Sequence, residues 1–141
     1  MEDKRLHLDF IQRIIARMAN NLFYLKGWTI TLIAALFALF VKDANSKFLV
    51  LAYFPVIICW TLDGYFLSQE RLFRALYDHV RKLDNEKIDF SMDTSKYKNK
   101  SNSWSSSMKS PTLLIFYIPL LIIMAAIIDL PSFFFLNFDC S

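Results

Sequence analysis

The sequence has little of what enzymes and metalloproteins use to build a site. It contains only two glycines, Gly27 and Gly64, so a glycine-rich phosphate-binding loop is excluded. Its two histidines, His7 and His79, have no cysteine or second histidine at metal-ligand spacing. A Ser-His-Asp triad is also without a local signature, although such triads assemble in space rather than in sequence. We therefore expect no metal, no cofactor and no enzymatic activity.

Helix breakers and charged residues are scarce as well. Four prolines and two glycines in 141 residues favour long continuous helices. Charged residues make up 21% of the chain, and nearly all of them lie outside three apolar stretches, Trp28–Val41, Phe48–Leu67 and Thr112–Phe135. Phe, Leu and Ile occur on every face of these stretches rather than in one stripe, which is typical of membrane helices.

The lengths of the apolar stretches support this interpretation. A helix needs about 20 apolar residues to cross a hydrocarbon core about 30 Å thick. Phe48–Leu67 has that length, and Thr112–Ile128 is a run of 17. Trp28–Val41 reaches 20 residues when it is extended back to Leu22, which places Lys26 just inside the boundary, where its stem can snorkel outward. We predict an all-α integral membrane protein with three transmembrane helices; three buried helices of a soluble core are the less favoured alternative.

The distribution of basic residues predicts the orientation. Of sixteen lysines and arginines, fourteen precede the first apolar stretch or lie between the second and third, and only Lys42 and Lys47 lie in the turn between the first two. The positive-inside rule then puts the N-terminus in the cytoplasm and the C-terminus, with Cys140, on the outer side of the membrane. Cys59 lies within a span, so the two cysteines cannot pair within one chain. Such a basic face can contact anionic lipids and indicates no nucleic-acid partner.

Residues 1–21 are expected to form an amphipathic helix rather than a cleavable signal peptide. Leu6, Phe10, Ile14 and Met18 recur every four residues, as on one face of a helix. This helix either lies on the inner leaflet or packs against other protein in the cytoplasm. Asn20, Asn21 and Gly27 favour a bend before the first span.

Residues 22–67 are expected to form a transmembrane hairpin, because the turn Lys42–Lys47 is short. The second helix has no breaker after Ser68 and should run from about Phe48 to Leu83, so that residues 68–83 project into the cytoplasm. Its apolar stripe needs cover from the N-terminal helix, of the same chain or of a neighbour. We predict it as an oligomer contact, consisting of Leu72, Phe73, Leu76 and Val80.

The rest of the chain divides into a linker and a third span. Residues 84–110 are rich in Ser, Asn, Lys and Asp and are expected to be a polar flexible linker. Within it, Ile88–Met92 alternates like a short strand, and Trp104 and Met108 are expected at the membrane interface. Residues 111–141 are expected to form the third transmembrane helix, kinked at Pro119, and an outer aromatic tail.

Asp63 is the main candidate for a functional residue, since an ionisable group within a span is costly to bury. It lies only four residues from the cytoplasmic end of its span, where Lys26 or Arg71 could pair with it. The two interpretations are a structural ion pair, which we favour, and a gating residue. Ala34 and Ala38 form a small-xxx-small pair that predicts close packing, either within the hairpin or between subunits.

Two segments resemble known bacterial proteins. The first comprises Phe10–Met18 and Lys26–Leu32, and the second is Leu62–Arg74. They resemble a widespread family of small bacterial inner-membrane proteins and are similar to SLATT-type membrane effectors, which occur beside nucleotide-signalling genes in defence islands. The resemblance covers about residues 8–83 and concerns architecture rather than catalysis. The third span departs from the two-span SLATT plan.

The resemblance implies a protein that oligomerises and breaches the membrane when triggered. We therefore expect a non-enzymatic, oligomeric inner-membrane protein that acts as a membrane-disrupting or pore-forming effector of phage defence. The alternative is a constitutive oligomeric scaffold or regulatory subunit that recruits a cytoplasmic partner. The expected partners are the lipid bilayer, further copies of the chain, and a cytoplasmic protein or nucleotide-signalling component.

Overall fold

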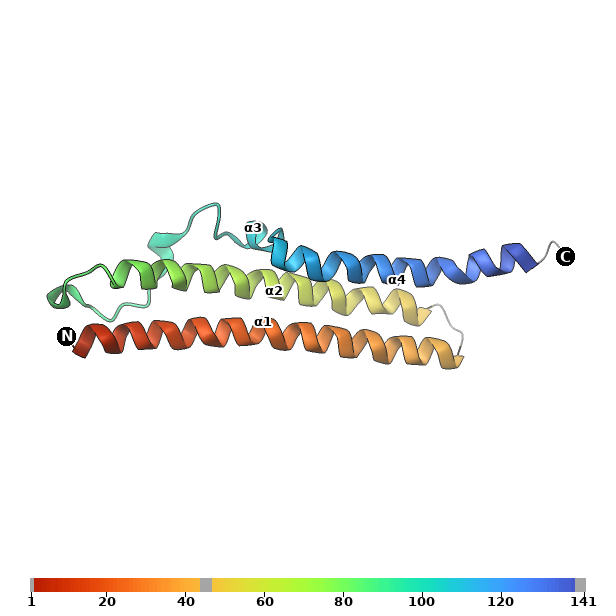
Figure 1. Cartoon of the computed structure of the whole chain (residues 1–141), viewed down its shortest axis with the longest axis horizontal. Helices are drawn as coiled ribbons and strands as arrows, with labels where there is room; N and C mark the ends of the chain where they lie inside the picture. Colours follow the sequence, from red (N-terminus) through yellow and green to blue (C-terminus); the bar gives the residue numbers. More distant parts are fainter. Residues whose placement is uncertain (1, 44–46, 139–141) are drawn as a thin grey trace.

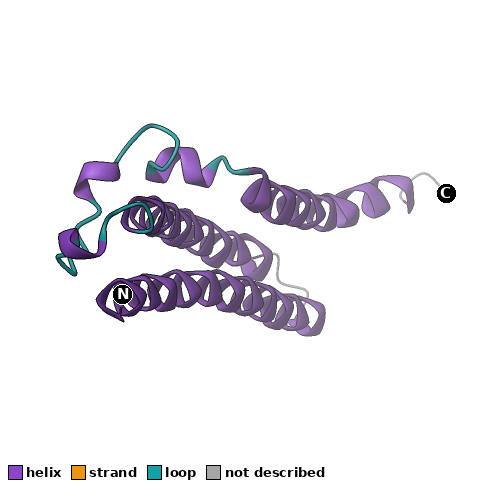
Figure 2. Cartoon of the chain, turned by 60° about the vertical axis from the view of Figure 1, so that its left-hand side comes forward, coloured by secondary structure: helices purple, strands orange, loops and turns teal. Residues whose placement is uncertain are grey.

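Four α-helices and two short 3₁₀ helices make up the part of the chain that the computed structural model describes, residues 2–43 and 47–138. Side chains are described there except for those of residues 41–49 and 128–138. No strand occurs in these ranges (Figure 2), which confirms the all-α prediction. Residues 44–46 of the predicted tight turn lie outside the described residues, as does Cys140.

Helices α1 (Glu2–Asp43) and α2 (Lys47–Val80) form an antiparallel hairpin and lie side by side along nearly their whole lengths (Figure 1). α1 is helical without interruption through Asn20, Asn21 and Gly27, where the sequence favours a bend. The propensity penalties of these residues are at most about 1 kcal/mol each. Continuous packing against α2 outweighs them.

α2 joins an apolar half to a charged half in a single helix. It ends at Val80, three residues before the expected end, and a turn follows at Arg81 and Lys82. The pair Glu70–Arg74 forms at 2.7 Å. Near the end of the helix, Asp78 pairs with Arg81, at 3.2 Å.

α4 (Pro111–Phe138) runs antiparallel to α2, on the side away from α1, and its C-terminal part extends beyond the end of the hairpin (Figures 1 and 2). The helix continues through Pro119. Two helical segments, Glu2–Phe40 and Val50–Val80, are long and apolar enough to cross a membrane, whereas the described apolar part of α4, Pro111–Ile127, is shorter.

Buried side chains form two separate cores. The first joins α1, α2 and α4 and consists of Ile33, Ala52, Val56, Cys59, Leu113, Tyr117 and Met124. The second joins the N-terminal half of α1 to the C-terminal half of α2, where Ile11, Leu76 and Val80 are buried and Leu8, Ile15 and Phe73 pack against them. The stripe of α2 is therefore covered within one chain, by a face of α1 centred on Ile11. The predicted stripe of α1 is only partly used, since Leu6 and Phe10 are 45% and 40% exposed.

The segment between α2 and α4 is folded onto the hairpin, unlike the expected flexible linker. It contains 3₁₀ turns at Asn85–Lys87 and Ser95–Tyr97 and the short helix α3 (Trp104–Met108). The predicted strand over Ile88–Met92 does not form.

Local side-chain hydrogen bonds explain why this polar segment is ordered. The carboxylate of Asp93 accepts a hydrogen bond from the backbone N–H of Ser95, at 2.8 Å, and this bond lowers the pKa of Asp93. Asn102 is buried, and its amide donates to the carbonyl of Tyr97 at 2.7 Å. Asn, Asp and Ser stabilise turns in this way without any apolar periodicity.

Candidate functional site

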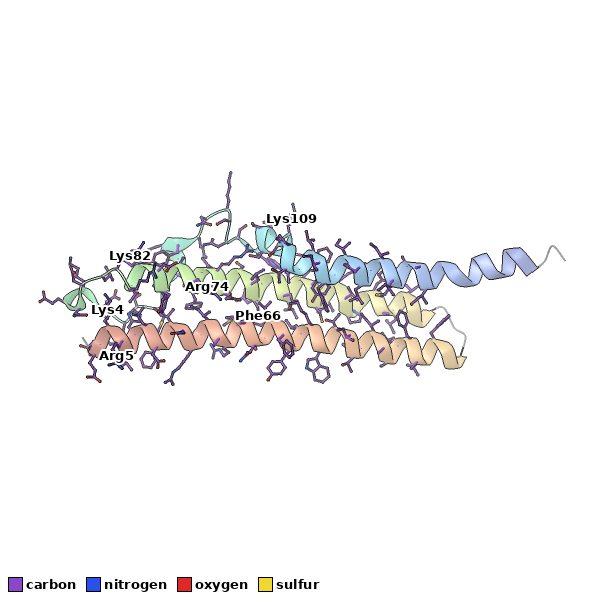
Figure 3. The ribbon with its side chains drawn as sticks, in the orientation of Figure 1. Lys4, Arg5, Phe66, Arg74, Lys82 and Lys109 are labelled. Carbon is purple, nitrogen blue, oxygen red and sulfur yellow. The ribbon has the colours of Figure 1, made fainter. Side chains whose placement is uncertain are left out.

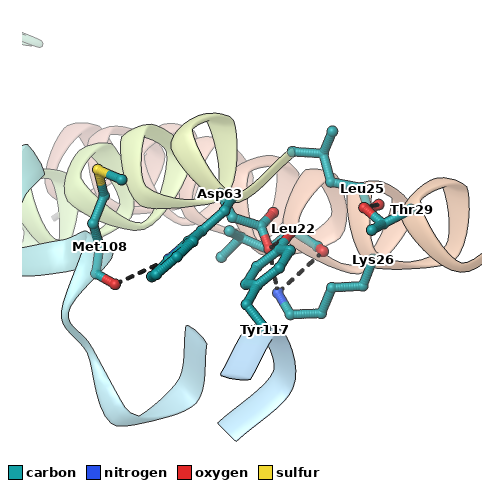
Figure 4. A network of polar contacts seen from close by, with 8 residues as sticks. Leu22, Leu25, Lys26, Thr29, Asp63, Met108 and Tyr117 are labelled. Carbon is teal, nitrogen blue, oxygen red and sulfur yellow. Dashed lines mark hydrogen bonds and ion pairs between the residues drawn. The ribbon is translucent and has the colours of Figure 1, made fainter. Parts of the chain in front are cut away.

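One polar cluster joins the three long helices. Lys26 of α1 donates a hydrogen bond from Nζ to Oδ2 of Asp63 in α2, at 2.8 Å (Figure 4). The hydroxyl of Tyr117 in α4 donates to the same oxygen, at 2.9 Å. Each helix thus contributes one member, so the cluster ties together segments that are 37 and 54 residues apart in sequence.

The two charged members of the cluster differ in their exposure to solvent. The Asp63 side chain has 0% exposure, whereas that of Lys26 keeps 22%. Oδ1 of Asp63 is buried and has no hydrogen-bond partner among the described residues. Nζ of Lys26 also lies 5.7 Å from the centre of the Phe116 ring and 3.4 Å from the carbonyl oxygen of Leu22. The lysine can reach solvent and the aspartate cannot.

Aromatic packing holds Tyr117 in place. Its ring stacks on that of Trp60, with centroids 5.7 Å apart and planes 14° apart. The indole N–H of Trp60 donates to the carbonyl of Met108, at 3.1 Å. The position of α4 against α2 is therefore coupled to that of α3.

α3 docks on α2 beside the cluster, at Gly64. A Cβ atom at Gly64 would collide with Met108 and would come within 3.3 Å of the Trp104 ring, so the absence of a side chain permits the close approach. The indole N–H of Trp104 donates to the carbonyl of Thr61 at 2.9 Å. Farther along α2, the hydroxyl of Ser68 donates to the carbonyl of Asn102 at 2.7 Å. We call this contact between α2 and residues 101–110 the α3 seam.

Arg71 belongs to the α3 seam rather than to the Asp63 cluster. Its guanidinium donates to the carbonyl of Ser101 at 3.0 Å and to the hydroxyls of Ser107 and Ser110 at 3.4 and 3.2 Å. Of the predicted group Asp63, Lys26 and Arg71, the structure brings together the first two. Tyr117 was not predicted as a member of the site. The signal available in the sequence was a hydroxyl-bearing residue two turns into an apolar helix.

The residues predicted as oligomer contacts fall into two sets. Leu72, Leu76 and Val80 are 3%, 3% and 2% exposed, and Phe73 is half-buried. Ile11 of α1 forms one core with Leu76 and Val80. Ala34 and Ala38 are exposed on α1. The small-residue pair therefore does not pack within the hairpin, and it stays available on the surface of a single chain.

A second buried polar group lies at the other end of the hairpin. His7 is 1% exposed, and its Nε2 lies 3.1 Å from the carbonyl oxygen of Ser91. The ring packs 5.3 Å from that of Phe90, whose φ of 54° is unusual for a bulky residue. No group of three or more His, Cys, Asp or Glu side chains that could hold a metal ion occurs within residues 2–43 and 47–138.

Large aromatic side chains surround the Asp63 cluster on the outside of the molecule. Tyr24 and Trp28 flank Lys26 on α1 and are 63% and 64% exposed. Tyr65 on α2 is 47% exposed, and Trp104 on α3 is 53% exposed. We call these four residues the aromatic belt. The Lys26–Asp63 and Trp104–Thr61 contacts place them near one level along the helices.

Comparison with known proteins finds no matching family model, no matching curated protein and no matching solved structure. The resemblance to SLATT-type effectors therefore stays a prediction from the two quoted segments.

Proposed function

We propose that the chain is a non-enzymatic integral membrane protein of the bacterial inner membrane, with three spans, a cytoplasmic N-terminus and an outer C-terminus. Support comes from the surface of the hairpin: in the most apolar 18-residue windows of α1 and α2, only 11% and 28% of the residues are buried. The core helices of a soluble protein would be mostly buried. Lipid is the solvent that such exposed apolar surface favours.

The aromatic belt supports a specific depth for this protein. Tyr and Trp concentrate where a bilayer meets water. No charged residue lies between Gly27 and Val41, between Phe48 and Leu62, or between Pro111 and Ile128. The end of the hairpin that holds the N-terminus, away from these uncharged runs, carries basic residues, among them Lys4, Arg5, Arg74 and Lys82 (Figure 3). The belt then marks the cytoplasmic boundary, and the Asp63 cluster lies at that boundary.

We further propose that the protein acts as an oligomeric effector that breaches the membrane, and that the Asp63 cluster is the latch of its closed state. The observation that carries this proposal is the buried Lys26–Asp63–Tyr117 contact, with one partner from each long helix. Separating the helices would leave a charged carboxylate in apolar surroundings, which is costly unless water enters. Opening the latch and admitting water are therefore linked.

Measurement of membrane potential in a bacterial host tests the latch. Lys26→Met should depolarise the cells at an expression level at which the wild-type protein is silent, because it removes the cation that holds Asp63. Lys100→Met, in an exposed loop position, removes the same charge and should stay silent. Membranes washed with alkaline carbonate should retain all three proteins, and release of the wild-type protein would contradict the membrane assignment itself.

One observation favours a second function, a constitutive scaffold that recruits a cytoplasmic partner. In the cytoplasmic halves of α1 and α2, the stripe of α2 is already covered within the chain, so its pairing cannot be the triggered step. A scaffold predicts that neither the wild-type protein at high expression nor Lys26→Met changes the membrane potential. That result would reject the effector and retain the scaffold.

A further inference from the structure

An open, shallow cavity of about 620 Å³ lies on the surface beside the α3 seam, between α2 and the start of α4. Three basic side chains line it, Arg71, Arg74 and Lys109, together with one acidic residue, Asp78. Ser106 and Ser110 add hydroxyl groups. Figure 3 shows Lys109 beside the start of α4 and Arg74 farther along α2.

Ion pairs inside the protein neutralise only part of this charge. Arg74 pairs with Glu70 at 2.7 Å, and Asp78 pairs with Arg81 at 3.2 Å. Neither Arg71 nor Lys109 has an acidic partner within 4 Å in the described part of the chain. The cavity therefore carries two cations whose charge is not balanced by the fold.

The hydrogen bonds of Arg71 leave room for an anion. A guanidinium group has five N–H donors in a planar fork. The bonds to Ser101, Ser107 and Ser110 account for three of them, and Arg71 donates no other hydrogen bond to a described residue. A planar fork with free donors matches the geometry of phosphate oxygens, and lysine adds a point charge.

The position of the cavity identifies the source of the phosphate. Arg71 lies eight residues beyond Asp63 on α2, which is about 12 Å along the helix axis. If the aromatic belt marks the cytoplasmic boundary, as proposed above, Arg71 and Lys109 lie at the level of the headgroups. The cytoplasmic leaflet of a membrane is rich in anionic lipids.

We propose that this cavity is a binding site for the phosphate group of an anionic phospholipid, with Arg71 and Lys109 as its cationic partners. Ser106 and Ser110 supply hydroxyl donors around the same group. Because Arg71 also holds Ser101 and Ser110 of the α3 seam, a lipid bound there would clamp α3 and the start of α4 onto α2. This inference rests on the proposed membrane location.

Lipid titration followed by native mass spectrometry tests the site. Full-length protein in mild detergent should bind dioleoylphosphatidylglycerol about tenfold more tightly than dioleoylphosphatidylcholine, a difference of the size expected from one or two charge-assisted hydrogen bonds. Lys109→Gln should remove most of this preference, and Arg71→Gln should do so as well. Lys109→Gln is the decisive variant, since the Lys109 side chain makes no hydrogen bond within the described structure and its loss should not unfold the α3 seam.

A matched control separates the site from the general basic character of this end of the molecule. Lys98→Gln, in the same loop but outside the cavity, removes one charge and should keep the preference for phosphatidylglycerol. If Lys98→Gln and Lys109→Gln reduced the preference for phosphatidylglycerol equally, the proposal would be overturned. Equal binding of the two lipids by the wild-type protein would overturn it as well.

The source of the phosphate is tested by competition. Free glycerol 3-phosphate at millimolar concentration should not displace the lipid, because it lacks the acyl chains that keep a lipid at the boundary. Displacement would overturn the lipid assignment in favour of a soluble phosphate ligand. Carbonate extraction is scored in parallel: a retained protein without lipid preference contradicts this inference alone, whereas an extracted protein contradicts the proposed function.

Discussion

The two glycines of this chain have opposite environments, and the contrast yields a paired prediction. A methyl group at Gly27 would meet nothing within 4 Å, whereas one at Gly64 would collide with Met108. Gly27→Ala should raise the free energy of unfolding by about 0.5–1 kcal/mol, the helix-propensity gain. Gly64→Ala should lower it by about 1–3 kcal/mol, because α3 must move away from α2.

Denaturant titration in detergent measures both changes. Tryptophan fluorescence in a Trp28→Phe background, which keeps Trp60 and Trp104 at the α3 contact, reports whether α3 has moved. The expected signature is a spectral change in Gly64→Ala only. Equal stabilisation by both substitutions would mean that Gly64 is not a packing requirement of the α3 seam.

The Asp63 cluster predicts an asymmetry between its two charged members. Lys26→Met leaves a carboxylate that is fully buried, and breaking a buried pair in this way costs about 3–5 kcal/mol. Asp63→Asn leaves a lysine that is 22% exposed and can turn toward water, so its cost should be smaller, about 1–2 kcal/mol. The double variant should be more stable than Lys26→Met. A double-mutant cycle by denaturant titration checks this order, and equal costs for the two single variants would contradict it.

At the scale of elements, the core between the N-terminal half of α1 and the C-terminal half of α2 holds together the end of the hairpin that is proposed to be cytoplasmic. Leu76 is 3% exposed there, whereas Leu6 on the same end of the molecule is 45% exposed. Leu76→Ala should cost about 2–5 kcal/mol and should open the pair to proteolysis within residues 2–20. Leu6→Ala should cost well under 1 kcal/mol, and similar protease sensitivity of the two variants would show that the core is not what protects α1.

The outward face of α1 gives a prediction about assembly. Ala34 and Ala38 are exposed, and small residues at this spacing let two membrane helices approach closely. If the protein is an oligomer through this face, Ala34→Leu combined with Ala38→Leu should reduce cross-linked dimers and larger species by about tenfold, a change of about 1.4 kcal/mol in association. Leu32 is also exposed on α1, so Leu32→Ala is the control and should leave cross-linking unchanged.

At the scale of the whole molecule, the separation of charge from apolar surface predicts the orientation. Fourteen of sixteen lysines and arginines lie in segments assigned to the cytoplasm. A membrane-impermeant thiol reagent should label Cys140 in intact cells expressing Cys59→Ala. Labelling only after lysis would invert the proposed topology. Cys140→Ser, which keeps only the buried Cys59, should stay unlabelled in both conditions.

Much of the fold could be predicted from local pattern. The unbroken apolar composition of Trp28–Val41 and Phe48–Leu67 implied helices, and the short connection between them implied an antiparallel hairpin. The segment 84–110 could not be predicted in this way. Its order comes from hydrogen bonds of Asn, Asp and Ser side chains and from contacts such as Lys4 Nζ to the carbonyl of Leu83, at 2.6 Å, which link residues 79 positions apart.

The residues of the candidate site also differ in whether the sequence could predict them. Asp63 could be found in the sequence because a charge within an apolar run is conspicuous, and Lys26 because it lies at the same expected depth. Tyr117 could not, since its role depends on α4 packing beside α2 at one particular register. The partner of Arg71 was equally hidden: the sequence offered an acid two turns away, but the α3 seam supplies carbonyl and hydroxyl groups instead.

The sequence by itself determined the helical class, the approximate extent of α2 and the placement of charge at one end, because these follow from residue composition and periodicity along the chain. The tertiary structure decided which apolar stripe covers which, that Tyr117 and Lys26 share one carboxylate oxygen, and that a polar loop closes over α2. These depend on the relative position of helices distant in sequence. Many weak contacts set that position together, and no local pattern encodes it.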